Sequence, residues 1–203
     1  RILPVAVICA LALTMPAVAG AGGFAQREDV RAFIEEMHER HGFYRARLTR
    51  QFGQAQPQPK AIQAILPPKD PSVRSWQAYR ARFVEPNRIE GGLRFWQAHR
   101  QTLEAARRAY GVPEEIIVAI IGIETIYGRN VGKFPALATL ATLAFDYPPR
   151  AELFRRELEA LLLLARESHR SPIAYSGSYA GALGIPQFLP SSIRNWGVDF
   201  DED

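Results

Sequence analysis

One glutamate follows an entirely apolar segment of the chain. Residues 116–123 contain no polar side chain, and Glu124 comes directly after them. A helix that is apolar all round is normally buried, so we expect the Glu124 carboxyl to emerge at the end of a buried element. Because burial disfavours the charged form, the carboxyl should keep its proton near neutral pH, as a general acid must. The alternative is a structural carboxyl that caps a backbone or pairs with Arg129 or Arg150.

This glutamate has no obvious acidic companion. Glycoside hydrolysis normally uses two carboxyl groups about 5 to 9.5 Å apart. Glu115 precedes Glu124 on the same predicted helix by a distance of roughly 13 Å, which is too far. Asp146 and Glu152 stay open as partners, although neither lies in a segment typical of a site. A lone glutamate is sufficient if it protonates the leaving oxygen and then deprotonates a hydroxyl of the substrate itself.

A second segment, residues 176–192, is rich in small residues and also carries aromatic and amide side chains. Its glycines would let the backbone approach a ligand closely. Tyr179, Gln187 and Phe188 could stack on a sugar and form hydrogen bonds with it. An ordinary tight loop between helices is the alternative, and for a Gly/Ser stretch taken alone it is the commoner case.

Helical patterns surround both segments. Between residues 27 and 41, apolar side chains recur at three- and four-residue spacing on one face. Further helices are predicted over residues 75–84, 92–110, 135–145 and 150–170, from Pro113 onward, and in a short segment that opens at Pro190. Prolines predict loops at 54–59 and 66–71. Since no stretch alternates with a period of two residues, the fold class is predicted to be mainly α.

Composition limits the classes of function. The chain has 203 residues, of which 47% are hydrophobic and 23% charged, as in a soluble globular protein. Its formal net charge of +4 is small and scattered, so we expect no nucleic acid as a partner. The single cysteine is Cys9. If the N-terminal segment is removed, thiol catalysis, cysteine–metal clusters and disulfides are excluded.

The N-terminal residues have the pattern of an export signal. Arg1 precedes an uncharged, mostly apolar stretch that ends in a small-x-small site at Ala19. This pattern is typical of a cleaved signal peptide, which we assign to residues 1–19. A transmembrane anchor is the alternative, but the stretch only reaches the lower length limit for a span. A lipidated Cys9 is a weaker option.

Three motifs in order resemble the membrane-bound lytic murein transglycosylase B family. They are residues 122–129 (GIETIYGR), 141–148 (ATLAFDYP) and 181–192 (GALGIPQFLPSS). The resemblance covers about residues 27–203. It implies a lysozyme-like helical catalytic core of the goose type with an N-terminal helical lobe. We place the lobe at residues 24–110 and the core at 111–203, and we expect the core to be truncated at its C-terminal end.

The resemblance also implies a reaction. The family cleaves the β-1,4 bond between N-acetylmuramic acid and N-acetylglucosamine of peptidoglycan without water and leaves a 1,6-anhydro ring. Glu124 matches the family's sole acid/base, and Ser178 matches a serine that hydrogen-bonds near the reacting sugar. The residues expected to line the glycan cleft and position the glycan are Tyr79, Tyr179, Gln187 and Phe188.

Two further matches concern charge. Arg150 matches the second of two arginines that contact the substrate peptide or sugar, whereas Pro149 stands in place of the first. Asp199, Asp201 and Asp203 are spaced as in the opening of an EF-hand-type loop, where some relatives bind calcium. An acidic loop start without an ion is the alternative. We expect no cofactor to be required for catalysis.

We therefore expect an exported, periplasmic monomer that binds peptidoglycan glycan strands. Outer-membrane association and contacts with other cell-wall enzymes are further expectations. A lysozyme-type hydrolase and a non-catalytic peptidoglycan-binding protein are the alternative functions, and the products of the reaction distinguish them.

Overall fold

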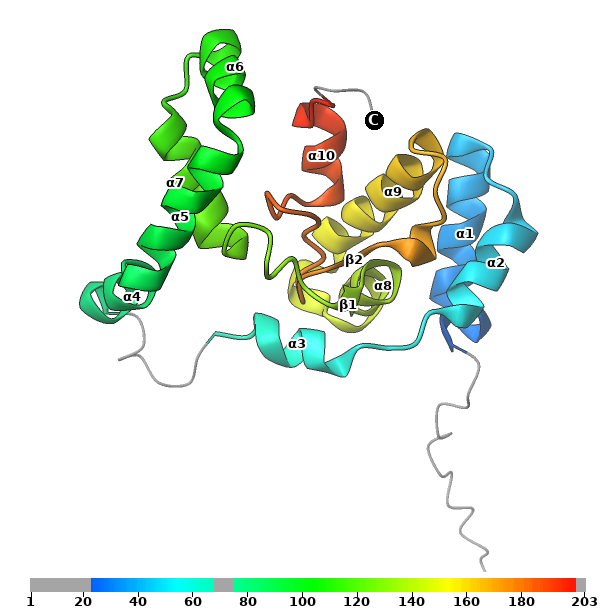
Figure 1. The fold of residues 1–203 in the computed structure, drawn as a ribbon. Coiled ribbons are helices and arrows are strands. Elements are labelled where there is room, and N and C mark those ends of the chain that lie inside the picture. Colours follow the sequence, from blue (N-terminus) through cyan, green and yellow to red (C-terminus); the bar gives the residue numbers. More distant parts are fainter. Residues whose placement is uncertain (1–22, 68–74, 200–203) are drawn as a thin grey trace, which may run out of the picture.

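The described part of the chain is built mainly of helices, as Figure 1 shows for a computed structural model that describes residues 23–67 and 75–199. The predicted mainly α fold class is therefore confirmed. The predicted signal peptide lies outside the described residues. None of the helices in these two ranges has both the length and the apolar composition that a membrane span requires.

The elements in chain order are η1 (Gly23–Gln26), α1 (Glu28–His41), α2 (Arg45–Gln54), α3 (Pro59–Ile65), α4 (Trp76–Phe83), α5 (Pro86–Ala98), α6 (Arg100–Tyr110), α7 (Glu114–Thr125), β1 (Phe134–Pro135), α8 (Ala136–Asp146), η3 (Pro148–Arg150), α9 (Ala151–Glu167), η4 (Pro172–Ala174), β2 (Ser176–Gly177) and α10 (Pro190–Trp196). The two short strands pair antiparallel.

The central helix of the core is α8. Every residue from 136 to 144 is buried, because small Ala and Thr side chains between its leucines let neighbouring elements approach from all sides. The contacts of α8 are with α9, α3, β1, η3 and η4. One hydrophobic cluster joins α8 and α9 to the predicted apolar face of α1 (Val30, Phe33, Ile34 and Met37) and to Phe24, Leu48 and Phe52.

A second group of helices, α4 to α7, lies to one side of this core (Figure 1). Within it, α7 packs mainly against α5 and α6. Val118, Gly122 and Thr125 are buried on the packed side, whereas Ile120 is 51% exposed and Ile116 48% exposed. The prediction that this apolar helix is buried on every side is wrong, because only one of its faces meets another described element.

The packing does not follow the predicted division at residue 110. Helix α7 lies after that position but packs on α5 and α6, which lie before it. Helices α1 and α2 lie before it but share the cluster of α8 and α9. The assignment of residues 24–110 and 111–203 as two domains stays a prediction.

Some helix boundaries also differ from the prediction. The helix predicted over 92–110 is two helices, because His99, with φ −115° and ψ 23°, interrupts the helical backbone. Helix α5 begins earlier, at Pro86, since the Glu85 carboxylate accepts hydrogen bonds from the backbone N–H groups of Asn87 and Arg88 at 3.0 and 2.8 Å. A proline in the first turn with an acidic cap is a favourable helix start. The predicted loop at 54–59 is shorter, because Pro59 begins α3.

Candidate active site

Glu124 lies in the last turn of α7, and its side chain is exposed. The prediction that Glu124 is buried is therefore wrong, because only one face of α7 meets another described element. Among the described residues, no hydrogen bond or ion pair engages its carboxylate, so the alternative of a pair with Arg129 or Arg150 is not found. A carboxylate held at a helix end without a protein partner is available to a substrate.

The chain leaves α7 through a left-handed turn. Ile126, Tyr127 and Gly128 have φ angles of 54°, 59° and 80°. A β-branched residue such as Ile126 rarely adopts this conformation, so the surrounding structure must enforce it. The Thr125 hydroxyl oxygen accepts a hydrogen bond from the Gly128 backbone N–H at 3.0 Å and supports the turn.

The Tyr127 side chain holds this turn against α5. Its ring occupies space left by three glycines, and a Cβ added to Gly122 or Gly92 would lie 2.6 or 2.7 Å from the Tyr127 hydroxyl oxygen. That hydroxyl donates to the carbonyl oxygen of Arg88 at 2.9 Å, and the Arg88 guanidinium donates to the Gly122 carbonyl oxygen at 2.6 Å. The sequence alone does not indicate this arrangement, because three glycines on two helices do not reveal the ring between them.

The segment that follows Tyr127 runs against the loop that carries Ser178. In the strand pair, Phe134 is opposite Gly177. Gly132 packs so closely on Gly177 that a side chain there would overlap its backbone. The Gln187 amide nitrogen donates to the carbonyl oxygen of Val131 at 3.1 Å. The structure therefore brings the two predicted chemical segments together.

Ser178 organises the start of its loop. Its hydroxyl oxygen accepts hydrogen bonds from the backbone N–H groups of Ala180 and Ala182 at 3.3 and 3.1 Å. Its own N–H donates to the carbonyl oxygen of Ala182 at 2.9 Å. Because the oxygen acts as an acceptor in both side-chain bonds, the hydroxyl hydrogen stays available for an acceptor on a ligand.

Two glycines of this loop pack on protein rather than facing a ligand. Gly177 and Gly181 are buried. A Cβ on Gly181 would lie 2.8 Å from Cγ of Leu140 on α8, and one on Gly177 would overlap the Ala182 carbonyl. The expectation that these glycines admit a ligand is wrong for both, because they seat the loop on the core. Gly184 is exposed.

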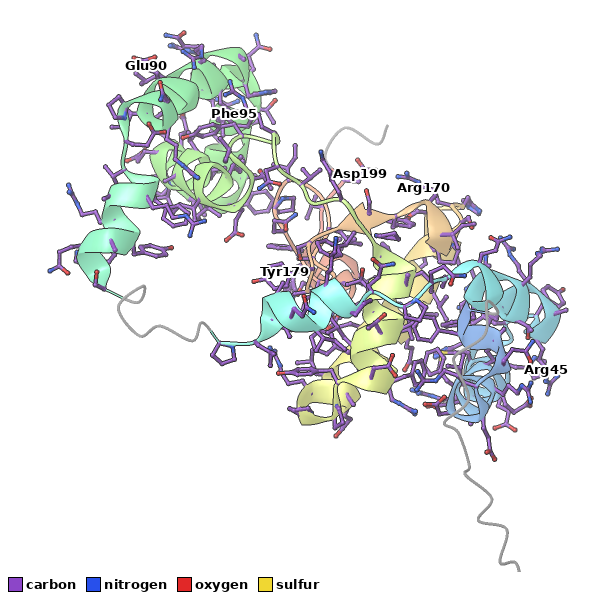
Figure 2. All side chains as sticks on the ribbon, turned by 90° about the horizontal axis from the view of Figure 1, so that it is seen from below. Arg45, Glu90, Phe95, Arg170, Tyr179 and Asp199 are labelled. Carbon is purple, nitrogen blue, oxygen red and sulfur yellow. The ribbon has the colours of Figure 1, made fainter. Side chains whose placement is uncertain are left out.

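The predicted sugar-binding side chains of the loop are at least partly accessible. Tyr179 and Phe188 are exposed, and Figure 2 shows Tyr179 in the middle of the view, between the α4–α7 group and the α1–α2 pair. Phe188 lines a groove of about 640 Å³ together with Tyr175, Ile193 and Trp196. Gln187 is half-buried and uses its amide nitrogen inside the protein, which leaves its carbonyl oxygen for a ligand.

Tyr79 and Arg150 lie elsewhere. Tyr79 is exposed on α4 and packs between Trp76 and Phe83, with ring centres 6.0 and 4.5 Å away. Arg150 lies at the junction of α8 and α9, and its guanidinium is 5.5 Å from the ring centre of Phe154. Within the described ranges, no hydrogen bond, ion pair or ring contact joins either residue to Glu124 or Ser178. Their role in substrate binding stays a prediction.

The carboxyl groups left open as partners of Glu124 are engaged in ion pairs. Asp146 pairs with Arg27, and Glu152 pairs with Arg156 at 2.6 Å. The described residues also contain no group of three or more His, Cys, Asp or Glu that could hold a metal ion. Of the three predicted calcium ligands, Asp201 and Asp203 lie outside the described residues, so the calcium site stays a prediction.

Glu157 supports the site and was not identified from the sequence. It is a buried residue of α9, and its carboxylate accepts hydrogen bonds from the Ser191 hydroxyl at 2.6 Å and the Ser191 N–H at 2.9 Å. These bonds fix the first turn of α10 and with it the end of the loop that carries Gln187. A serine in the first turn of a helix does not reveal that a distant glutamate binds it.

Known proteins share this arrangement of elements. A family model described as the transglycosylase SLT domain matches residues 25–203. The membrane-bound lytic murein transglycosylase B of Escherichia coli (strain K12) is 41% identical over 191 residues, which cover 90% of this chain and 53% of the relative. The chain thus spans about half the length of this relative.

Solved structures of lytic transglycosylases superpose closely on the chain. SltB1 from Pseudomonas aeruginosa is 46% identical with a TM-score of 0.83, covering 86% of this chain and 59% of that protein. Escherichia coli Slt35 in complex with bulgecin A is 42% identical with a TM-score of 0.84, covering 90% of this chain and 58% of that protein. The fold is therefore the lysozyme-like fold of these enzymes. With a family model that matches from residue 25 to the last residue, the chain belongs to the transglycosylase SLT domain family.

Proposed function

We propose that this chain carries the catalytic site of a peptidoglycan lytic transglycosylase. The reaction cleaves the β-1,4 bond between N-acetylmuramic acid and N-acetylglucosamine and leaves a 1,6-anhydro end. The observation that carries the proposal is the Glu124 carboxylate, which is exposed at the end of α7 and has no protein partner among the described residues. The family and the names of the relatives support the same reaction class.

One carboxyl group can perform both proton transfers. Glu124 donates its proton to the glycosidic oxygen as the bond to the muramic C1 breaks, which gives an oxocarbenium-like state. The carboxylate then takes the proton of the muramic 6-hydroxyl, whose oxygen bonds to C1 and closes the anhydro ring. No water is consumed, and the glutamate ends in its original protonation state.

Bound glycan would provide the shielding that the chain itself does not give. A strand lying over the exposed Glu124 excludes water, and desolvation favours the protonated acid that the first step needs. Ser178 would donate its hydroxyl hydrogen to the substrate, a role supported by the two backbone N–H groups that already bind its oxygen. Tyr179 and Phe188 offer exposed rings for stacking on sugars.

Ligands of related proteins support the substrate class. SltB3 from Pseudomonas aeruginosa, 29% identical with a TM-score of 0.75, was solved in complex with NAG-NAM-pentapeptide. Escherichia coli Slt35 was also solved in complex with calcium. We extend the proposal to an envelope location reached through the signal at residues 1–19 and to a structural calcium ion at Asp199, Asp201 and Asp203, with no ion used in the chemistry.

The test is the substitution Glu124→Gln, assayed on purified sacculi with mass spectrometry of the soluble products. We expect turnover to fall by about three orders of magnitude or more, because the amide cannot transfer a proton. The thermal stability should be unchanged, since the side chain is exposed. Glu115→Gln, an exposed glutamate at the other end of α7, is the matched control and should keep full activity.

The products decide between the proposed function and its alternatives. Anhydro ends are lighter by one water than the reducing ends that a lysozyme-type hydrolase leaves. Reducing ends from the wild-type protein would replace the proposal by hydrolysis. Binding of sacculi without any product would identify a non-catalytic binding protein, and near-normal activity of Glu124→Gln would remove Glu124 from its role.

A further inference from the structure

A cavity of about 320 Å³ lies away from the proposed catalytic residues. It opens between the α1–α2 turn and the C-terminal end of α9, and its floor is formed by Leu48, Leu162 and Ala165. Helix α7, which carries Glu124, is on the opposite side of the molecule from α1 and α2 (Figure 1). The cavity is therefore remote from Glu124, although it shares Arg170 with the groove that Phe188 lines.

The wall of this cavity is basic. Arg47, Arg166, Arg170 and His169 line it, and no carboxylate does. None of the three arginines forms an ion pair within residues 23–67 and 75–199, although many other arginines of the chain do. Unpaired guanidinium groups around a concave, partly apolar surface favour an anionic ligand.

Two of these arginines are held in place by aromatic rings. The Arg166 guanidinium is 4.5 Å from the ring centre of Phe43 and donates to the His41 carbonyl oxygen at 2.7 Å. The Arg170 guanidinium is 5.0 Å from the ring centre of Tyr175. Because these contacts restrain the two guanidinium groups before binding, the groups should lose less conformational entropy when a ligand arrives.

A polar side chain at the cavity lacks a protein partner. Gln51 lines the cavity and is only 7% exposed. Its carboxamide forms no hydrogen bond with any residue that the structure describes. No buried side-chain nitrogen or oxygen among the described residues lacks a hydrogen-bond partner, so the Gln51 amide atoms reach the cavity, where a peptide group of a ligand would match both its donor and its acceptor.

We propose that this cavity binds an acidic peptide, specifically a carboxylate-bearing stem peptide of peptidoglycan, as a holding site distinct from the site of cleavage. The arginines would bind the carboxylates, Gln51 a peptide group, and the apolar floor small side chains such as alanine methyl groups. This inference rests on the proposed function, since it takes the ligand from the same polymer.

The experiment titrates a soluble stem pentapeptide into the purified protein by calorimetry. The same peptide with its carboxylates amidated is the ligand control. We expect Arg166→Gln combined with Arg170→Gln to weaken binding by about tenfold or more, because each charged hydrogen bond is lost. Arg156→Gln, an exposed arginine on the same helix that already pairs with Glu152, should bind as the wild type does.

A second variant controls for misfolding of the first, because the Arg166 side chain also binds the C-terminal end of α1. Arg47→Gln removes a cavity charge that has no described partner, and it should weaken binding by several-fold at an unchanged Tm. The Glu124→Gln protein should bind the peptide with the affinity of the wild type. Loss of cleavage and loss of peptide binding can therefore be distinguished.

Three results would overturn the proposal. They are equal affinity for the amidated peptide, wild-type affinity in the arginine variants, and arginine-dependent binding to phosphatidylglycerol vesicles with none to the peptide. The last result would identify a membrane surface as the ligand.

Discussion

Helices α7 and α8 are both strongly apolar, yet only one of them is buried. Helix α8 is enclosed by α9, α3 and shorter elements, and Leu140 and Leu143 are fully shielded from solvent. Helix α7 packs on α5 and α6 with one face and leaves Ile120 half exposed. Apolar composition alone therefore does not decide burial, because neighbours must also be present on every side.

The two helices have different tasks in the proposed site. The loop with Ser178 is seated on α8 through Gly181, which packs against Leu140. The carboxyl of Glu124 is presented to solvent by the end of α7, where the Tyr127 turn fixes the direction of the chain. A rigid buried helix thus positions the loop, and an exposed helix end supplies the reacting group.

The largest expected effect is a difference between the two helices in the stability lost when an apolar side chain is truncated. Leu143→Ala in α8 should lower the free energy of unfolding by about 3 kcal/mol, because it leaves a cavity in a fully packed core. Ile120→Ala in α7 should cost less than about 1 kcal/mol, because its side chain is already half exposed. Urea denaturation of both variants gives the comparison. Equal losses would mean that α7 is covered in the folded protein.

A smaller effect concerns the room that glycine makes for Tyr127. Gly122→Ala places a Cβ 2.6 Å from the Tyr127 hydroxyl oxygen, so the ring must move. We expect a loss of about 1–3 kcal/mol in stability and a lower rate of product release from sacculi. Gly53→Ala in α2 is the matched control, since its Cβ would meet only the Ala25 Cβ at 3.6 Å. A Gly122→Ala protein with normal Tm and rate would show that the Tyr127 turn does not position Glu124.

Sequence periodicity was sufficient for much of the fold. The face of α1, the start of α10 at Pro190 and the mainly α class followed from local spacing and proline chemistry, which act within a few residues. The split at His99 did not, because nothing in the composition of residues 92–110 distinguishes one long helix from two. The exposure of α7 depends on which elements surround it, and a sequence pattern contains no such information.

Residues of the candidate site could be named from the sequence, but their geometry could not be predicted from it. Glu124 and Ser178 stood out by residue type and motif, and the structure joins their segments through Val131 and Gln187. Their supports, Tyr127 and Glu157, act through contacts with residues 34 to 39 positions away in the chain. Such contacts become visible only when the helices are placed in space.

The smallest expected effect lies at the C-terminal end of α8, where Arg27 pairs with Asp29 and Asp146. The hydrogen bonds from Arg27 hold the pKa of Asp29 below its usual 3.8. A carboxyl whose pKa is lower in the folded state stabilises the fold at pH values above its pKa in the unfolded state. This contribution is lost as the pH falls through its pKa in the folded state. Arg27→Gln should therefore cost at most about 1 kcal/mol at pH 7, since both side chains are about one-third exposed.

The difference in Tm between Arg27→Gln and the wild type should shrink as the pH falls below about 4, where the unfolded-state carboxyl takes up its proton. Arg27 also contacts the rings of Phe24 and Phe145, whose centres each lie 5.7 Å from its guanidinium. These contacts do not depend on the carboxyl, so a residual difference in Tm should remain. Leu143→Ala provides the contrast, because lost apolar packing lowers the Tm at every pH. If the loss of Tm in Arg27→Gln were also independent of pH, Arg27 would stabilise the protein through its aromatic contacts and not through its ion pairs. The end of α8 would then be stabilised by apolar packing, as its centre is.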